Sequence, residues 1–194
     1  MFGYPIFAEN LRTMKAIKLI PLSILSIALF SCEPNDPVDP NEEELITTFN
    51  VDLEANGFTY TLNYTDLDGD GGNAPILTID SLSANTTYSG SITLFNESET
   101  PTEEITPEVF DEANDHQFFF SSSGSSTFVY SDQDDNGNPL GLSFEVTTGN
   151  TANETFTFVL RHEPDKSAAG VSSGDITNAG GETDIEVSFD VIIE

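Results

Sequence analysis

One stretch of the chain places acidic side chains at the spacing that can hold a metal ion. Asp66, Asp68 and Asp70 occupy alternate positions, and Gly71 follows the third. Carboxylates at positions 1, 3 and 5 of a loop can converge on one hard cation, and the glycine permits the tight turn that brings them together. Without a cation, three like charges this close in sequence repel one another. The spacing therefore predicts a calcium site in this turn.

A second acidic turn repeats the arrangement in a weaker form. Its candidate ligands are Asp132, Asp134 and Asn136, and Gly137 follows them. Because a neutral amide replaces the third carboxylate, this turn holds less negative charge than the first. We expect any calcium site in either turn to be structural and weak.

Neither turn has the complete ligand set of an EF-hand loop. Position 12, which a bidentate glutamate fills in that loop, holds Leu77 in the first turn and Ser143 in the second. Asp80 near the first turn, or Glu145 near the second, would have to complete the shell. Asp, Asn and Gly are also the residues that turns select for backbone reasons alone. Two interpretations stay open, a calcium site and a polar turn without an ion.

The two histidines are the remaining candidates for metal or acid–base chemistry. His116 and His162 each stand at the edge of an expected strand beside an acid, Asp115 and Glu163 respectively. A zinc site needs at least one further close ligand, and no cysteine is near either histidine. We therefore expect solvated histidines at strand ends. No residues stand at a spacing typical of a nucleophile with its base, so the sequence does not predict an enzyme.

The elements that would hold these residues are mostly short strands. Apolar and polar side chains alternate over nine segments, as in half-buried strands. They are residues 49–53, 58–64, 76–79, 88–95, 116–121, 127–130, 142–147, 155–161 and 184–191. One helix is expected, with Thr106 as its N-cap and Pro107 at its first position. The loop 164–181, rich in Ser, Gly and Ala, is expected to be mobile.

About nine short strands separated by turn residues predict an all-β domain, a single antiparallel β-sandwich with one short crossover helix. Leu82, Thr86 and Tyr88 lead into an alternating strand and resemble the tyrosine-corner stretch of fibronectin type III domains. The resemblance implies an immunoglobulin-like sandwich in which the Tyr88 hydroxyl bonds back to the backbone. Ala84 and Asn85 replace the proline and glycine that are usual in this stretch.

The charge of the chain limits its partners. The 194 residues include 34 acidic and five basic ones, a formal net charge of −29 at pH 7. Only Arg161 and Lys166 follow Cys32, against 33 acids. Nucleic acids and anionic lipid surfaces are bound through basic patches, so this composition excludes both as partners. An acidic surface that attracts cations and one that only keeps the protein soluble are both compatible with it.

An apolar run, residues 19–31, ends at the only cysteine of the chain, Cys32. It follows a short basic segment that begins at Met14. The run is too short to span a bilayer, which takes about 20 residues, so we expect residues 14–31 to be a cleaved signal peptide. Residues 1–13 lie upstream of this complete signal, and we expect the true start to be Met14.

The last four residues of this segment are Leu29, Phe30, Ser31 and Cys32, and they resemble a bacterial lipobox. The resemblance implies cleavage before Cys32 and a lipid attached to it, although Phe30 is bulkier than the usual residue. An ordinary signal peptide with an incidental cysteine is the alternative. The acidic and proline-rich residues 32–44 predict an extended tether, and residues 45–194 predict the folded β-sandwich domain.

Taken whole, the chain resembles small uncharacterised acidic lipoproteins of Bacteroidetes-type bacteria. That resemblance implies a bacterial outer-membrane protein, held in the membrane by the lipid on Cys32 and facing the periplasm or the surface. Our leading hypothesis is a binding or interaction module of the cell envelope for a protein or glycan partner, stabilised by Ca²⁺. The alternatives are a purely structural envelope component and, less favoured by the residues, an unrecognised hydrolase.

Overall fold

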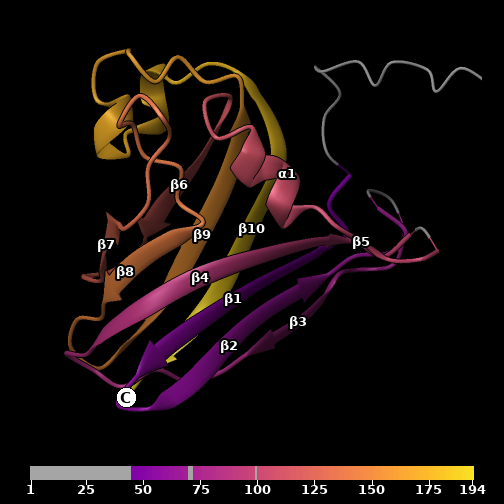
Figure 1. The fold of residues 1–194 in the computed structure, drawn as a ribbon. Coiled ribbons are helices and arrows are strands. Elements are labelled where there is room, and N and C mark those ends of the chain that lie inside the picture. The colour runs from indigo at the N-terminus through magenta and orange to yellow at the C-terminus, as the bar shows by residue number, and fades with distance from the viewer. Residues whose placement is uncertain (1–44, 70–71, 99) are drawn as a thin grey trace, which may run out of the picture. The chain divides into compact units, whose positions relative to one another are not determined.

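The structure is a computed structural model, and it describes residues 45–69, 72–98 and 100–194. The signal peptide, Cys32, the tether 32–44 and the candidate ligand Asp70 lie outside the described residues. Within them the protein is mostly β, with ten strands in two antiparallel sheets and one short helix (Figure 1). No helix of this part of the chain is long and apolar enough to cross a membrane.

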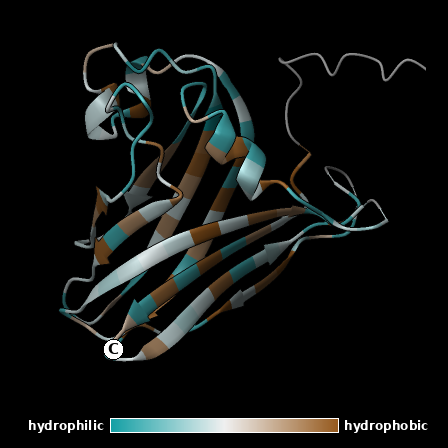
Figure 2. Cartoon of the chain, viewed as in Figure 1, coloured by the Kyte–Doolittle hydropathy of each residue, from teal (hydrophilic) through white to brown (hydrophobic). Residues whose placement is uncertain are grey.

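The larger sheet has seven strands. They are β1 (Thr48–Ala55), β2 (Phe58–Thr65), β3 (Ile76–Ile79), β4 (Thr87–Asn96), β5 (Glu103–Glu104), β7 (Thr127–Tyr130) and β8 (Ser143–Thr147). Their order is β3-β2-β1-β4-β8-β7, and β5 pairs with the end of β4. Figure 2 shows the alternation of apolar and polar residues along these strands. In β1 the alternation buries Phe49, Val51 and Leu53 on one face, as the sequence predicts.

The smaller sheet has three strands, β6 (His116–Ser122), β9 (Ala152–His162) and β10 (Glu182–Ile193), in the order β10-β9-β6. The helix α1 (Thr106–Asp111) stands in the chain between β5 of the large sheet and β6 of the small one. It therefore makes the crossover that the sequence predicts. Its buried residue Val109 packs into the shared core.

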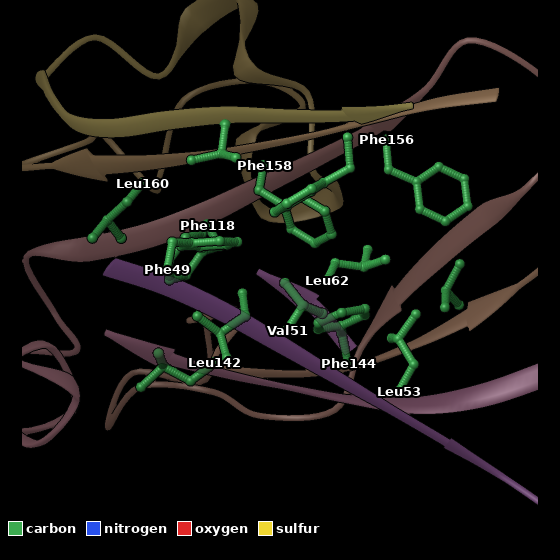
Figure 3. Close-up of a cluster of buried hydrophobic side chains, with 14 of the residues drawn as sticks. Phe49, Val51, Leu53, Leu62, Phe118, Leu142, Phe144, Phe156, Phe158 and Leu160 are labelled. Atoms are coloured by element: carbon green, nitrogen blue, oxygen red, sulfur yellow. The ribbon is translucent and has the colours of Figure 1, made fainter. Parts of the chain in front are cut away.

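Phenylalanine rings join the two sheets into one core (Figure 3). The ring of Phe49 in β1 lies 5.9 Å from that of Phe118 in β6 and 5.5 Å from that of Phe158 in β9, measured between centroids. All three side chains are buried. Tilted rings at these separations attract one another in addition to the gain from removing them from water. The aromatic content of the inward positions thus fixes how the sheets pack.

The structure contains all nine expected strands and corrects two details. A tenth strand, β5, pairs with β4 through two residues, which is too short for any alternation to predict it. The residue that caps α1 is Ile105, whereas we expected Thr106. The hydroxyl of Thr106 instead accepts a hydrogen bond of 2.9 Å from the backbone N–H of Leu94, so it anchors the helix to β4.

The loop 164–181 packs against the outer face of the small sheet. It contains two short 3₁₀ turns, η1 (Val171–Ser173) and η2 (Ile176–Asn178). Val171 and Ala179 are buried there against Phe119 and Val159. Both faces of β6 and β9 are therefore covered, which explains why apolar side chains occupy consecutive positions in these strands.

Candidate functional site

Three ionisable side chains from three neighbouring strands meet at one end of the small sheet. His116 is the first residue of β6, His162 is the last of β9, and Asp184 lies near the start of β10. His116 and His162 are direct partners in the antiparallel register. Their imidazole centroids are 4.7 Å apart, with 35° between the ring planes. In Figure 1 this end of the sheet is the upper one, on the side of α1.

The carboxylate of Asp184 faces both histidines. Its Oδ2 lies 3.6 Å from Nε2 of His116, and its Oδ1 lies 3.8 Å from Nδ1 of His162. One ligand atom from each of the three residues falls within 4.8 Å of the other two. Two imidazole nitrogens and one carboxylate oxygen therefore converge on a single small volume.

A β-bulge turns Asp184 toward the histidines. The register of β10 with β9 shifts between Thr183 and Ile185, so Asp184 is an extra residue in its strand. Beyond the bulge, β10 buries Ile185 and Val187 and exposes Glu186. Regular alternation would place Asp184 on the exposed face with Glu186, but its side chain is 0% exposed. Bulges commonly redirect one side chain next to a functional site.

The hydrogen bonding of His116 fixes which nitrogen carries its proton. Its Nδ1 lies 3.2 Å from the backbone carbonyl oxygen of Glu112, the C-cap residue of α1. A carbonyl oxygen only accepts hydrogen bonds, so Nδ1 carries the hydrogen. In the neutral imidazole, Nε2 then presents its lone pair toward Asp184. The helix end and the strand pairing together hold this ring in place.

The burial of these residues overturns our expectation of solvated histidines. The side chain of His116 is 0% exposed and that of His162 is 6% exposed. Both lie on the face of their strands that also carries Phe118 and Leu160, because side chains two positions apart share a face. The cluster does not follow from the sequence pattern, because Asp184 lies 22 residues beyond His162 and a bulge cannot be seen in a regular alternation. Two histidines that pair across strand ends were the available signal.

The turn after His162 has a backbone that few residues tolerate. Glu163 has a φ of 51° and Gly181, opposite it, has a φ of 67°. A Cβ atom at Gly181 would lie 2.1 Å from the carbonyl oxygen of His162, so any side chain there would push the strand end away. Glycine at this position therefore keeps β9 and β10 in register beside the cluster.

The described carboxylates of the first acidic turn organise its backbone. Oδ1 of Asp66 accepts a hydrogen bond of 2.9 Å from the N–H of Gly69. Oδ2 of Asp68 accepts bonds from the backbone N–H of Asn73 at 3.0 Å and from its side-chain amide at 2.7 Å. These bonds, the backbone one first, hold the pKa of Asp68 below its usual value. The pattern suits a polar turn, and calcium binding here stays a prediction.

The second acidic turn uses its carboxylates in the same way. Oδ1 of Asp132 accepts from the N–H of Gly141 at 2.6 Å and its Oδ2 from that of Ser143 at 2.8 Å. The ammonium group of Lys166 donates a hydrogen bond of 3.0 Å to Oδ2 of Asp134. A protein cation therefore already stands beside one of the predicted calcium ligands.

The remaining predicted ligand of this turn, Asn136, contributes both its backbone and its side chain to protein contacts. Its N–H donates to Oδ1 of Asp134 at 2.9 Å, and its Nδ2 donates to Oδ1 of Asn114 at 2.7 Å. The structure thus links Asp134 and Asn136 with Lys166 in one network, whereas the hydrogen bonds of Asp132 go to the backbone of Gly141 and Ser143. It does not bring the three predicted ligands of this turn to the histidine cluster.

A cleft adjoins the first turn and the histidine cluster. It has a volume of about 560 Å³ and lies between the first acidic turn and the start of β10. Asp66, Asp68 and Glu186 give its lining an acidic character, and Leu45 and Leu67 add apolar surface. Asp184 belongs to the same lining.

Comparisons of the chain with models of protein families, with curated proteins and with solved structures found no match.

Proposed function

We propose that this chain is a lipid-anchored domain of the bacterial outer membrane that acts as a binding or interaction module of the cell envelope. The observation that carries the proposal is the sequence Leu29, Phe30, Ser31 and Cys32, placed directly after an apolar segment with a basic start. A lipid on Cys32 would hold the domain at the membrane, and the tether 32–44 would keep it at a distance from the surface.

An immunoglobulin-like arrangement of the two sheets is part of this proposal. The hydroxyl of Tyr88, a fully buried residue, accepts a hydrogen bond of 2.7 Å from the backbone N–H of Ser83. This is the kind of bond that the resemblance to the tyrosine corner implies. The adjacent Leu82 bridges to Ile193 at the end of β10, so the corner also links the two sheets. Both contacts support an immunoglobulin-like β-sandwich.

The cleft is the surface that best suits a ligand of a binding module. Acidic residues in its lining attract a partner with basic groups. The domain itself has few basic residues that could neutralise these acids. Leu45 and Leu67 are 59% and 55% exposed and offer apolar contact beside those acids. A protein or glycan partner with both kinds of group would match this surface. Such a ligand would bind at the end of the domain that the acidic turn and β10 form.

The anchor is tested by the mass of the protein recovered from membranes. We expect a mature chain that begins at Cys32 and carries fatty acyl groups, and a Cys32→Ser variant that leaves the membrane fraction. A Ser31→Ala variant is the matched control, because a small residue before the cysteine is kept. Recovery of an unmodified thiol at Cys32 would remove the membrane from the proposal.

The binding surface is tested by photo-crosslinking in intact cells. A photoreactive amino acid at Leu67 reports on the cleft, and one at Val129 of the edge strand β7 is the control, because both side chains are more than half exposed. We expect a discrete adduct from position 67 only. Equal adducts at both positions would indicate unspecific contact. Absence of any adduct would favour a structural envelope component instead.

A further inference from the structure

We propose that His116, His162 and Asp184 bind one divalent transition-metal ion of the zinc class. This proposal goes beyond a binding module at the membrane and is independent of the lipid anchor. It rests on the donor atoms, on their separations, on the hydrogen bond that orients His116 and on the burial of the cluster.

The donor set selects the class of ion. Imidazole nitrogen suits Zn²⁺, Cu²⁺ and Ni²⁺, and a carboxylate oxygen is a common additional ligand of these ions. Calcium prefers six to eight oxygen ligands, and this cluster offers oxygen only from Asp184. Two histidines and one acid also form a usual three-ligand set for zinc, with a water molecule in the fourth position. The cluster therefore differs in kind from the calcium sites that the acidic turns predict.

The separations are close to those of a metal site and too long for direct hydrogen bonds. The distances of 3.6 Å and 3.8 Å from Asp184 to the two imidazole nitrogens exceed the usual limit of about 3.2 Å for an N–H···O bond. Two ligands of a tetrahedral zinc ion stand about 3.4 Å apart, given metal–ligand bonds of about 2.0–2.1 Å. Binding of the ion would draw the three donor atoms, which now lie within 4.8 Å of one another, together to that spacing.

The environment of His116 matches that of a metal ligand. Histidines that bind metals usually donate their second ring N–H to a backbone carbonyl or a carboxylate, which fixes the tautomer and the ring. Nδ1 of His116 donates in this way to the carbonyl of Glu112, and Nε2 is directed to Asp184. The pairing of His116 with His162 across the two strands then holds both rings before any ion arrives.

A simple ion pair between Asp184 and one histidine explains the cluster less well. One carboxylate can neutralise one imidazolium, but here two imidazoles 4.7 Å apart face the same carboxylate in a buried place. A second buried positive charge would cost much free energy of desolvation. A metal ion uses both imidazoles in their neutral form and the carboxylate as an anion. Its binding would tie β6, β9 and β10 together at their common end.

The test is metal binding by the full-length chain after treatment with a chelator. We expect one tight Zn²⁺ or Co²⁺ per chain by calorimetry, and visible absorption of bound Co²⁺ that an excess of Ca²⁺ does not remove. The variants His116→Gln and Asp184→Asn should weaken the affinity for Zn²⁺ by about 100-fold. Asp190→Asn is the matched control, because it removes an exposed charge six positions away on the same strand and outside the cleft, and we expect a change of less than about twofold.

A spectroscopic measurement covers the case in which a variant fails to fold. The EPR spectrum of Cu²⁺ bound to the unaltered protein should show coupling to two nitrogen nuclei, one from each imidazole. Coupling to no nitrogen, or an equal loss of affinity in the Asp190→Asn control, would assign any binding to the acidic surface and overturn the proposal. Absence of binding at one ion per chain would overturn it as well.

Discussion

Lys166 and Asp134 form a buried ion pair, with 3.0 Å between Nζ and Oδ2 and side chains that are 5% and 1% exposed. Burial, the largest influence on Lys166, lowers its pKa more than the nearby carboxylates raise it. Burial raises the pKa of Asp134, but hydrogen bonds from Asn138 and Lys166 outweigh it and lower that pKa. The lowered pKa of Lys166 favours its neutral form, whereas the lowered pKa of Asp134 favours its charged form, so the two shifts disagree about whether the pair is ionic. Because Nζ also donates to the carbonyls of Ala113 at 2.6 Å and Pro139 at 3.1 Å, we assign it the charged form.

We expect Lys166→Met to destabilise the domain by about 3 kcal/mol, because it leaves the buried carboxylate of Asp134 without its cation. Unfolding by denaturant measures the change. The double variant Lys166→Met with Asp134→Asn removes both charges, and an amide oxygen still accepts from the turn backbone, so it should recover about 1 kcal/mol or more. A double variant no more stable than the single one would show that the ion pair is not what holds the loop 164–181 to the acidic turn.

Glu154 gives the protein a specific sensitivity to acid. Burial, the largest influence, acts to raise its pKa, but hydrogen bonds from Ser122, Ser125 and Ser126 outweigh it and lower the pKa from 4.5 to about 2. The shortest of them, from Oγ of Ser122, is 2.6 Å long. A lowered pKa in the folded state contributes stability that is complete above the unfolded value, and this contribution is lost as the pH falls from about 5 toward 2.

We therefore expect Glu154→Gln to lower the free energy of unfolding by about 2 kcal/mol at pH 7. The difference from the unaltered protein should shrink as the pH approaches 2, since protonation removes the same charge. Unfolding curves at several pH values measure this. Glu145→Gln, at an exposed position of β8, is the control and should leave the pH dependence unchanged. A difference that is constant with pH would assign the effect to packing rather than to charge.

The parts of the fold that the sequence predicts are those in which each strand has one face in the core. Phe49, Val51 and Leu53 alternate with polar residues because only one face of β1 is covered. Consecutive apolar residues such as Phe118 and Phe119 carry no such signal, because the loop 164–181 buries the second face. That the loop packs there depends on contacts far apart in the sequence. Periodicity alone does not contain this information.

The cluster of His116, His162 and Asp184 could not be predicted from the sequence for a related reason. The strand order β10-β9-β6 brings together residues that are 68 positions apart, His116 and Asp184. The bulge then reverses the side on which Asp184 lies. The acidic turns, in contrast, are local in sequence, so their residue spacing alone indicates them, although in the structure their carboxylates accept hydrogen bonds from backbone N–H groups. A local motif therefore suggests an ion site where the structure has hydrogen-bonded turns, and a regular alternation of residues gives no sign of the bulge.

Gly90 in β4 leaves room for the ring of Phe144 in β8. A Cβ atom at this position would lie 2.4 Å from the ring, which is fully packed in the core. We expect Gly90→Ala to destabilise the domain by about 2 kcal/mol, because the ring cannot move without displacing its neighbours. Thermal unfolding measures the change, and Ser89→Ala on the exposed face is the control. Gly90→Ala combined with Phe144→Leu should lose less than the sum of the two single variants.

Calcium binding by the first acidic turn is separable from metal binding by the histidine cluster. If Asp66 and Asp68 hold Ca²⁺ together with groups outside the described residues, Ca²⁺ at about ten times its dissociation constant should stabilise the domain by about 1.4 kcal/mol and raise the melting temperature by a few degrees. Asp68→Asn should abolish this shift, whereas Asp184→Asn should leave it in place, because calcium does not use the histidine cluster. Asp132→Asn tests the second turn in the same way. A melting temperature that Ca²⁺ does not change would establish both acidic turns as hydrogen-bonded turns without an ion.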